Sequence, residues 1–332
     1  MTRRFDVTAL GELLIDFTDS GLSPAGMQLF ERNPGGAPAN VLAALARFGH
    51  QTAFLGKVGA DMHGDFLRDT LMTAGIDVRG LISDPEVFTT LAFVALDPGG
   101  ERSFSFARKP GADTCLRREE LDCQRLRDAR VLHIGSLSMT REPVRSATVA
   151  AVHIARDAGA VISYDPNYRA SLWPSQEAAE EQMRRLARQA DLIKLSDQET
   201  ELLTGERGPR QAALALRRQG AACVAVTLGP EGALVAAGDG VVHVPGFAVT
   251  AVDTTGAGDA FFAGITMGLT YGKTMDEACE IGTRLSASVI CTSENVCPRF
   301  LPSEFGLEPG RAAGEQLTFD TVSYTHLRAH ET

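Results

Sequence analysis

The chain has 332 residues, of which 44% are hydrophobic and 6% aromatic, with 33 glycines and a formal net charge of −10. This length suits one large α/β domain with a small appendage, and the glycine content favours tight turns and close helix–sheet contacts over a β-sandwich. The acidic excess argues against nucleic acid as the main partner, because proteins bind the phosphates of a nucleic-acid backbone with clustered Lys and Arg. A site for an anionic ligand must therefore be built locally, from helix N-termini, loop amides or a metal ion.

The cysteines and the N-terminus indicate the expected compartment. The six cysteines are scattered and include no C-x-x-C pair, so we expect reduced thiols and not disulfides. The first residues are basic and then apolar, but Asp6 and Glu12 interrupt the apolar stretch, which is not typical of a signal peptide. No window approaches the roughly 18 apolar residues of a membrane span. The sequence therefore predicts a cytoplasmic protein with no membrane partner.

Apolar segments rich in β-forming residues alternate with helical segments along most of the chain. The expected strands are 5–10, 52–58, 131–134, 161–164, 192–195 and 223–228. The expected helices between several of them are 39–48, 64–74, 141–158 and 210–219. This alternation predicts βαβ units, and so a three-layer α/β/α domain with a mostly parallel central sheet.

Two further pairs of β-rich segments do not alternate with helices. They are 13–17 with 27–32, and 88–96 with 102–108, the second pair joined by a strong turn signal at 97–100. We expect them to form a small antiparallel β-sheet lid, drawn from about residues 12–34 and 86–110. A plain surface hairpin is the alternative. The lid is favoured because the segments flank Gly35 and Gly36, which are candidate substrate contacts.

The apolar pattern fades after Pro302. We therefore expect one domain over residues 1–302 and an irregular tail over 303–332. The residues after about Gly306 lack a periodic apolar face and should contribute little to the core. The last ten residues, SYTHLRAHET, look like a translated cloning scar and are expected to be non-native.

The segment DTTGAGDAFFAG, residues 253–264, carries the strongest chemical signal. It leads from a β-like segment, 242–252, into a helical one. Gly256 and Gly258 let backbone N–H groups approach an anion closely, at a helix N-terminus whose dipole favours negative charge. Asp259 falls in the first turn, where the same dipole favours its ionised form. A carboxylate beside an anion hole suits phosphoryl transfer, and the alternative is an ordinary glycine turn with an acidic residue at the helix start.

A second cluster, GGAPAN at residues 35–40, opens an expected helix. The two glycines again permit close backbone approach, and the Asn40 side chain offers the donors and acceptors that sugar hydroxyls need. Asp16 follows three apolar residues near the end of a strand segment. It is either a turn former or a ligand for hydroxyls, and neither feature identifies the ligand by itself.

Taken together, these motifs resemble those of the ribokinase-like (PfkB) carbohydrate kinases, and within them most of all bacterial fructokinases. The resemblance covers about residues 5–302, and its most specific motif is DTTGAGDAFFAG. Supporting motifs are GGAPANVLAALARFG at 35–49, GKVGADMHGDFL at 56–67 and SYDPNYRASLW at 163–173. The resemblance implies a large ribokinase-like α/β domain and a small β lid through which the chain forms a homodimer.

The resemblance also implies a role for each matching residue. Asp259 is the implied catalytic base, beside an anion hole made by Gly256, Ala257 and Gly258. Sugar contacts are implied for Asp16, Gly36, Asn40, Arg108 and Arg169. Nucleotide contacts are implied for Thr227, Gly229 and Gly232. Glu199 is implied to act indirectly on Mg²⁺, while Asp253 and Thr255 match positions that bind a monovalent cation such as K⁺.

Three segments depart from the family pattern. Ser196 replaces the Asn of an N-x-x-E motif whose Glu199 is retained, which leaves the details of the metal shell open. An expected aromatic–Arg pair near the lid is Ala107–Arg108. The adenine-side segment, Thr292–Pro298, lacks the usual Lys-Gly-rich form.

The activity implied by the resemblance is transfer of the γ-phosphoryl group of ATP to D-fructose, with Mg²⁺ and K⁺ as cofactors. The nearest alternative is a 2-keto-3-deoxygluconate kinase, because its relatives share the Asp-Pro-Asn-x-Arg segment and because Arg108 and Arg169 could hold a carboxylate. Ribokinase and nucleoside kinase activities are further alternatives. A non-catalytic sugar-binding relative is disfavoured, because Asp259 and both motif glycines are present.

Overall fold

The computed structural model describes residues 3–96, 102–238, 240–291, 317 and 319. The expected turn at 97–100 and the adenine-side segment at 292–298 lie outside these residues. In the part of the chain that is described, no helix is both long and apolar enough to cross a membrane.

Nine strands of the described chain form one large sheet in the order β13-β12-β11-β10-β9-β8-β1-β4-β5. They are β1 (Phe5–Leu10), β4 (Thr52–Gly59), β5 (Asp77–Asp84), β8 (Ala129–Gly135), β9 (Val161–Asp165), β10 (Leu192–Ser196), β11 (Cys223–Thr227), β12 (Ala233–Ala237) and β13 (Gly240–Val244). All neighbours from β5 to β11 pair in parallel, and only the two pairs at the other edge, β11–β12 and β12–β13, are antiparallel. Strand β4 is buried along its whole length, as expected of a parallel strand covered on both faces. The predicted, mostly parallel sheet is confirmed.

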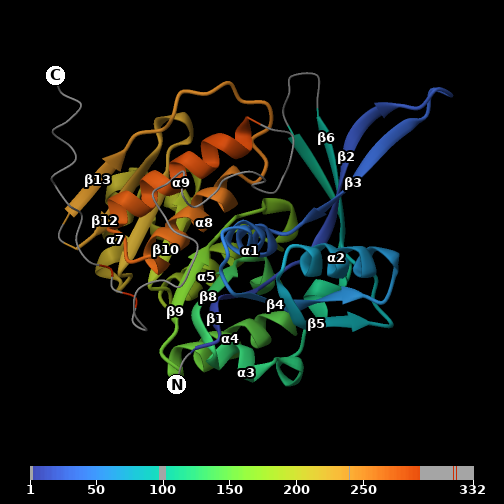
Figure 1. Ribbon diagram of the computed structural model, residues 1–332, viewed down its shortest axis with the longest axis horizontal. Helices are drawn as coiled ribbons and strands as arrows, with labels where there is room; N and C mark the ends of the chain where they lie inside the picture. Colours follow the sequence, from blue (N-terminus) through green and yellow to red (C-terminus); the bar gives the residue numbers. More distant parts are fainter. Residues whose placement is uncertain (1–2, 97–101, 239, 292–316, 318, 320–332) are drawn as a thin grey trace.

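Helices cover both faces of this sheet, and each layer has its own cluster of buried residues. One face is covered by α1 (Ala37–Arg47), α2 (Met62–Thr73), α8 (Ala257–Thr270) and α9 (Met275–Ile290). The other face is covered by α3 (Cys123–Arg127), α4 (Val144–Asp157), α5 (Gln176–Ala187), α6 (Thr200–Thr204) and α7 (Pro209–Arg218). The three layers predicted from the alternation are therefore confirmed (Figure 1).

The first turns of these helices differ in a way that positions the site. Helix α2 begins at Asp61, whose carboxylate accepts hydrogen bonds from the N–H groups of His63 and Gly64. Helices α1 and α8 begin instead after Gly36 and Gly256, which have no side chain with which to cap the first turn. The carboxyl group of Glu12 binds the first amide of α1. The N-terminus of α8 therefore keeps the positive end of the helix dipole open to a ligand.

A second sheet of four strands stands away from the main body (Figure 1). It consists of β2 (Leu14–Leu22), β3 (Gln28–Gly35), β6 (Leu91–Leu96) and β7 (Arg102–Ala107), in the order β3-β2-β6-β7. Both hairpins are antiparallel as predicted, but β2 and β6 pair in parallel, so the sheet is mixed. The lid exposes several large apolar side chains, namely Leu22, Met27, Leu29, Phe30 and Phe93. Dimerisation through this lid stays a prediction.

The β-like segment expected at 242–252 is only partly a strand. Strand β13 ends at Val244, and residues 245–256 form no helix or strand. Pro245 has no N–H to continue the ladder. The following Gly246 lies so close to the turn before β12 that a Cβ there would meet the carbonyl oxygen of Pro230 at 2.3 Å. The prediction was wrong because close packing against this turn, and not β-propensity, sets the path of the chain.

Two residues of the tail touch the domain. We expected little contact between the residues after Gly306 and the core, but Leu317 and Phe319 are partly buried and pack against the cluster beneath α1, α8 and α9. Two isolated apolar side chains can contribute to a core without the periodic pattern by which helices and strands are recognised in a sequence.

Candidate active site

A cavity of about 230 Å³ lies where α1 and α8 begin, below the strands of the lid. It brings together eight of the residues expected to act on sugar, phosphate or cation: Asp16, Gly36, Asn40, Arg169, Thr255, Gly256, Gly258 and Asp259. These residues come from segments far apart in the sequence. Glu12, Lys194 and Asn167 also line it.

The start of α8 forms one wall of the cavity. Gly256 has a left-handed backbone, with φ of 74°, which glycine adopts without the steric cost of a Cβ. The helix then runs from Ala257, so that Asp259 lies in its first turn. The sequence predicted this juxtaposition of uncapped amides and a carboxylate, and the structure has it.

Asp259 meets α1 across the cavity. Its Oδ2 accepts a hydrogen bond of 2.8 Å from Nδ2 of Asn40. Burial raises the pKa of Asp259 to about 6, helped by the negative charge of Asp165 and opposed by Asn40, Lys194 and Arg169. The group is therefore mainly ionised at neutral pH, yet basic enough to accept a proton near that pH.

Asp16 lies on the lid side of the same cavity, on strand β2. Burial raises its pKa to about 6, and the positive charge of Arg169 opposes the rise. The neighbouring backbone is tightly packed: a Cβ on Gly35 would meet Oδ2 of Asp16 at 2.2 Å, and one on Gly36 would meet the carbonyl oxygen of Glu12 at 2.4 Å. Gly36 also has a φ of 120°. The backbone path therefore requires glycine at position 36, and a larger residue at Gly35 would displace the carboxylate of Asp16.

Arg169 follows Tyr168 in the loop after β9, and Glu199 holds this loop through a hydrogen bond. The Oε1 of Glu199 accepts a hydrogen bond of 2.7 Å from the N–H of Tyr168, and its Oε2 accepts from the N–H and Oγ of Ser196. Ser196 thus makes a capping box with Glu199, so the Ser that replaces Asn in the motif still binds the motif's glutamate. Glu199 is buried and does not line the cavity.

Arg108 has a different environment from the one that the resemblance implied. It is buried at the base of the lid, where Nε and Nη2 donate to Oδ2 of Asp113 at 2.9 and 2.6 Å. Nη1 also donates to Oγ1 of Thr140, and Nη2 donates to the carbonyl oxygen of Leu137. Arg108 is not among the residues that line the cavity. Its contact with the substrate stays a prediction, and the geometry gives it a structural role.

The expected nucleotide residues lie at the carboxyl end of β11, beside the end of β10. Thr227 is the last residue of β11, and Gly229 and Gly232 have φ values of 58° and 95°. A Cβ on Gly232 would meet the carbonyl oxygen of Val244 at 2.1 Å. The turn therefore requires glycine, and it lies outside the 230 Å³ cavity.

Asp253 lies before the start of α8. Its Oδ1 accepts a hydrogen bond of 2.7 Å from the N–H of Thr255, which folds the loop back on itself. Among the described residues, no group of three or more His, Cys, Asp or Glu side chains could hold a metal ion. Binding of a cation by Asp253 and Thr255 stays a prediction.

Two charged residues of the cavity were missed by sequence reasoning. Glu12 is buried, and its Oε1 accepts a hydrogen bond from the N–H of Ala37, the first residue of α1. Lys194 is buried within β10, where its Nζ donates to Oδ2 of Asp165 at 2.9 Å. A lysine inside an apolar strand, Leu-Ile-Lys-Leu-Ser, was the available signal, because a buried cation requires a partner.

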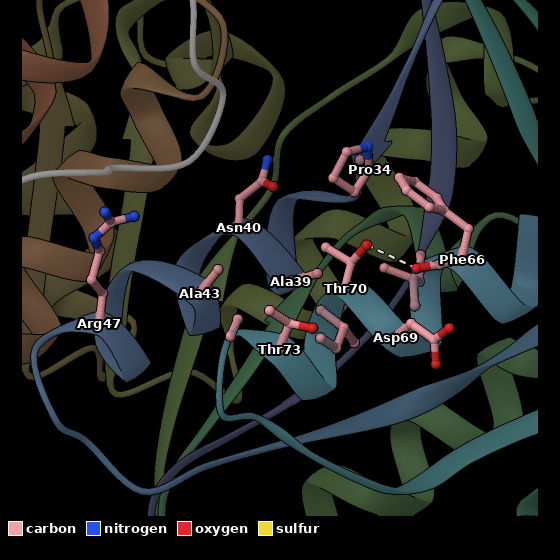
Figure 2. Close-up of a pocket in the computed structure, with 13 residues that line it drawn as sticks. Pro34, Ala39, Asn40, Ala43, Arg47, Phe66, Asp69, Thr70 and Thr73 are labelled. Carbon is pink, nitrogen blue, oxygen red and sulfur yellow. Dashed lines mark hydrogen bonds between the residues drawn. The ribbon is translucent and has the colours of Figure 1, made fainter.

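A second cavity, of about 510 Å³, lies behind the site between α1 and α2 (Figure 2). Asn40 borders both cavities, and Figure 2 shows its amide turned away from the threonines of α2. Thr70 of α2 binds the carbonyl oxygen of Phe66 in its own helix. Gly35 lines this second cavity as well, but none of the residues expected to bind phosphate does.

Comparisons with known proteins agree with this geometry. A family model described as pfkB family carbohydrate kinase matches residues 4–299. The chain is 45% identical over 258 residues to the probable fructokinase-2 of Arabidopsis thaliana, which covers 77% of this chain and 78% of the relative.

Two solved structures show the same likeness. The fructokinase from Xylella fastidiosa with bound ATP superposes with a TM-score of 0.82 and 31% identity, covering 90% of this chain and 97% of that one. A fructokinase double mutant from Vibrio cholerae O395, with fructose, ADP and potassium ion bound, has a TM-score of 0.80 and 30% identity, covering 93% and 100% of the two chains.

The raised pKa values of Asp16 and Asp259 predict an acid limb in the pH profile of kcat/KM. Asp16 and Asp259 both have pKa values of about 6, raised by burial from 3.8, so protonation should remove activity as the pH falls through 6. The pH dependence of kcat/KM reports the pKa values of groups in the free enzyme. We therefore expect kcat/KM to be constant above about pH 7 and to fall at least tenfold per pH unit below about pH 5. Asn40→Ala should move the limb to higher pH, since the hydrogen bond favours ionised Asp259. A limb near pH 4 in the wild type would contradict this prediction.

Proposed function

Because the chain belongs to the pfkB family of carbohydrate kinases, it is an ATP-dependent sugar kinase, and we propose that its acceptor is D-fructose, which becomes D-fructose 6-phosphate. Relatives named fructokinase support this sugar, as does the fructose bound to the similar Vibrio cholerae enzyme. The single observation that carries the proposal is the position of Asp259, within hydrogen-bond distance of Asn40 and in the first turn of an uncapped helix.

In the proposed reaction, the hydroxyl oxygen of the sugar attacks the γ-phosphorus of ATP. The carboxylate of Asp259 accepts the proton of that hydroxyl group. The bond between this phosphorus and the β–γ bridging oxygen breaks, and ADP leaves with the electron pair. The amides of Gly256, Ala257 and Gly258 stabilise the charge on the transferring group, which is where most of the catalytic effect in phosphoryl transfer arises.

The other residues of the cavity orient the sugar. Asp16 and Asn40 face the space between lid and sheet and can bind hydroxyl groups, with Gly36 allowing the sugar to approach the backbone. Arg169 keeps both carboxylates ionised by lowering their pKa values. Holding the hydroxyl and the phosphorus together converts an encounter in solution into an intramolecular step.

Thr227, Gly229 and Gly232 are proposed to bind the nucleotide.

The donor set constrains how Mg²⁺ would be held. Both oxygens of Glu199 already accept hydrogen bonds, and the described residues offer no cluster of three ligands. This arrangement fits an ion that is bound mainly by nucleotide phosphates and water, with Glu199 acting indirectly, as is usual for Mg²⁺. When bound, the ion neutralises charge on the phosphates of ATP.

A neutral sugar fits the cavity better than 2-keto-3-deoxygluconate. Of the two arginines that could hold a substrate carboxylate, Arg108 already binds Asp113, Thr140 and Leu137. Arg169 interacts with the carboxylates of Asp16 and Asp259, whose negative charge lines the same cavity and would repel an acidic sugar. We therefore place fructose first and keep the acidic sugar as the competing substrate.

A panel of acceptors tests this choice. We expect D-fructose to give the highest kcat/KM in a coupled ADP-release assay that also includes 2-keto-3-deoxygluconate, ribose and nucleosides. The margin over the acidic sugar should be at least tenfold, because the carboxylates of Asp16 and Asp259 repel its carboxylate. A strong preference for 2-keto-3-deoxygluconate would show that the fructokinase assignment is wrong while leaving the sugar kinase assignment intact.

A monovalent cation is proposed to bind near Asp253 and Thr255. The similar Vibrio cholerae enzyme carries a potassium ion, and a cation beside the start of α8 would add positive charge to the anion hole. Activity should therefore be higher in K⁺ than in tetramethylammonium at equal ionic strength. The activation by K⁺ should be lost in the Asp253→Asn variant. Equal wild-type rates in the two salts would contradict the proposed cation site.

A further inference from the structure

Lys194 is a buried cation inside the catalytic cavity that the proposed mechanism has not yet used. It lies in the middle of β10, is 7% exposed, and lines the same cavity as Asp259 and Gly258. Within the described part of the chain, its one hydrogen-bond acceptor is Oδ2 of Asp165. An ammonium group has three donors, so two of them can be given to a ligand.

The Nζ of Lys194 lies beside the second residue of α8. A Cβ on Gly258 would come within 2.8 Å of Nζ, so a larger residue there would displace the ammonium group from this position. An anion held by the first amides of α8 would therefore have Lys194 at its side.

The charges around Lys194 keep it protonated. Burial alone would lower its pKa, but the carboxylates of Asp165, Glu199 and Asp259 raise it above the ordinary lysine value. Lys194 therefore cannot act as a proton acceptor at neutral pH and acts as a fixed positive charge. In return, its charge lowers the pKa of Asp259.

The distribution of cations in the cavity points to the same role. Among the described side chains that line it, only Arg169 and Lys194 are cationic. Arg169 lowers the pKa values of both Asp16 and Asp259, whereas the Nζ of Lys194 lies beside Gly258 in the first turn of α8. The transferring phosphoryl group would arrive among carboxylates and needs a cation on the α8 side.

We propose that Lys194 is a further catalytic residue, whose ammonium group binds the γ-phosphoryl group of ATP at the start of α8. Its competing role is purely structural: the ion pair with Asp165 could simply hold the loop that leads to Arg169. The two roles differ in what they predict for the γ-phosphate. A ligand of that phosphate affects nucleotides that carry it and leaves ADP binding unchanged, and this holds for any sugar acceptor.

The test compares the affinities of two nucleotides for each Lys194 variant. Dissociation constants of AMP-PNP, which carries a γ-phosphate, and of ADP are measured by calorimetry with Mg²⁺ and without sugar. For Lys194→Met we expect AMP-PNP to bind at least tenfold more weakly and ADP to change less than threefold. We also expect kcat to fall at least about a hundredfold, the usual effect of losing one donor to the transition-state charge. Lys194→Arg should recover part of the AMP-PNP affinity.

Lys57 provides a matched control. It is also buried in a strand, 4% exposed, and its Nζ pairs with Asp84 and Glu120 outside the cavity. Lys57→Met should leave the ratio of the two dissociation constants unchanged, so it measures the effect of losing a buried lysine ion pair as such.

Equal weakening of both nucleotides by Lys194→Met, or no weakening, would overturn the proposal. If that variant does not fold, Asp165→Asn decides, because it removes the ion pair but keeps the ammonium group. The proposal expects Asp165→Asn to retain the wild-type preference for AMP-PNP, whereas loss of that preference would assign Lys194 a structural role. Since no sugar is present, neither outcome bears on the choice of fructose.

Discussion

The hydrogen bond between Asn40 and Asp259 joins the first turns of two helices, and the site depends on that junction. The two residues are 219 positions apart and meet at 2.8 Å only because α1 and α8 pack side by side on one face of the sheet. Both helices begin after a glycine that has no side chain to cap them, although Glu12 binds the first amide of α1. The two N-termini thus converge on one cavity, where Asp259 links them through Asn40.

This convergence requires close packing behind the site. Helix α8 contacts α9 so tightly that a Cβ on Gly264 would meet Cα of Gly282 at 2.5 Å. Such contacts fix the start of α8 relative to the sheet. A shift of about 1 Å there would separate the amides from the bound phosphate, and misplacement of that size can reduce rates by about a hundredfold.

Burial in this cavity has opposing effects on the chemistry. It raises the pKa values of Asp16 and Asp259 to about 6, which makes Asp259 a better proton acceptor but moves both groups closer to protonation. Asn40, Arg169 and Lys194 lower the pKa of Asp259 and so keep it ionised. The cavity therefore needs its cations and amides for the base to work at neutral pH.

Much of this organisation could be predicted from local patterns. Alternating strands and helices predicted the three layers, and DTTGAGDAFFAG placed Asp259 in the first turn of a helix. Features that depend on contacts between distant segments could not be read in the same way. The parallel pairing of β2 with β6, the partners of Arg108, and the approach of Lys194 to Gly258 each require the folded chain.

The most direct test concerns the carboxylate itself. Asp259→Asn keeps the shape of the side chain but removes the proton acceptor, while the amides of α8 and the turn at Gly229 are unchanged. General-base catalysis typically contributes about 10²- to 10⁴-fold, so kcat for fructose should fall at least about a hundredfold. ATP affinity, measured on the same folded variant, should be nearly that of the wild type. Retention of more than about a tenth of the wild-type kcat would contradict the assignment of Asp259 as the base.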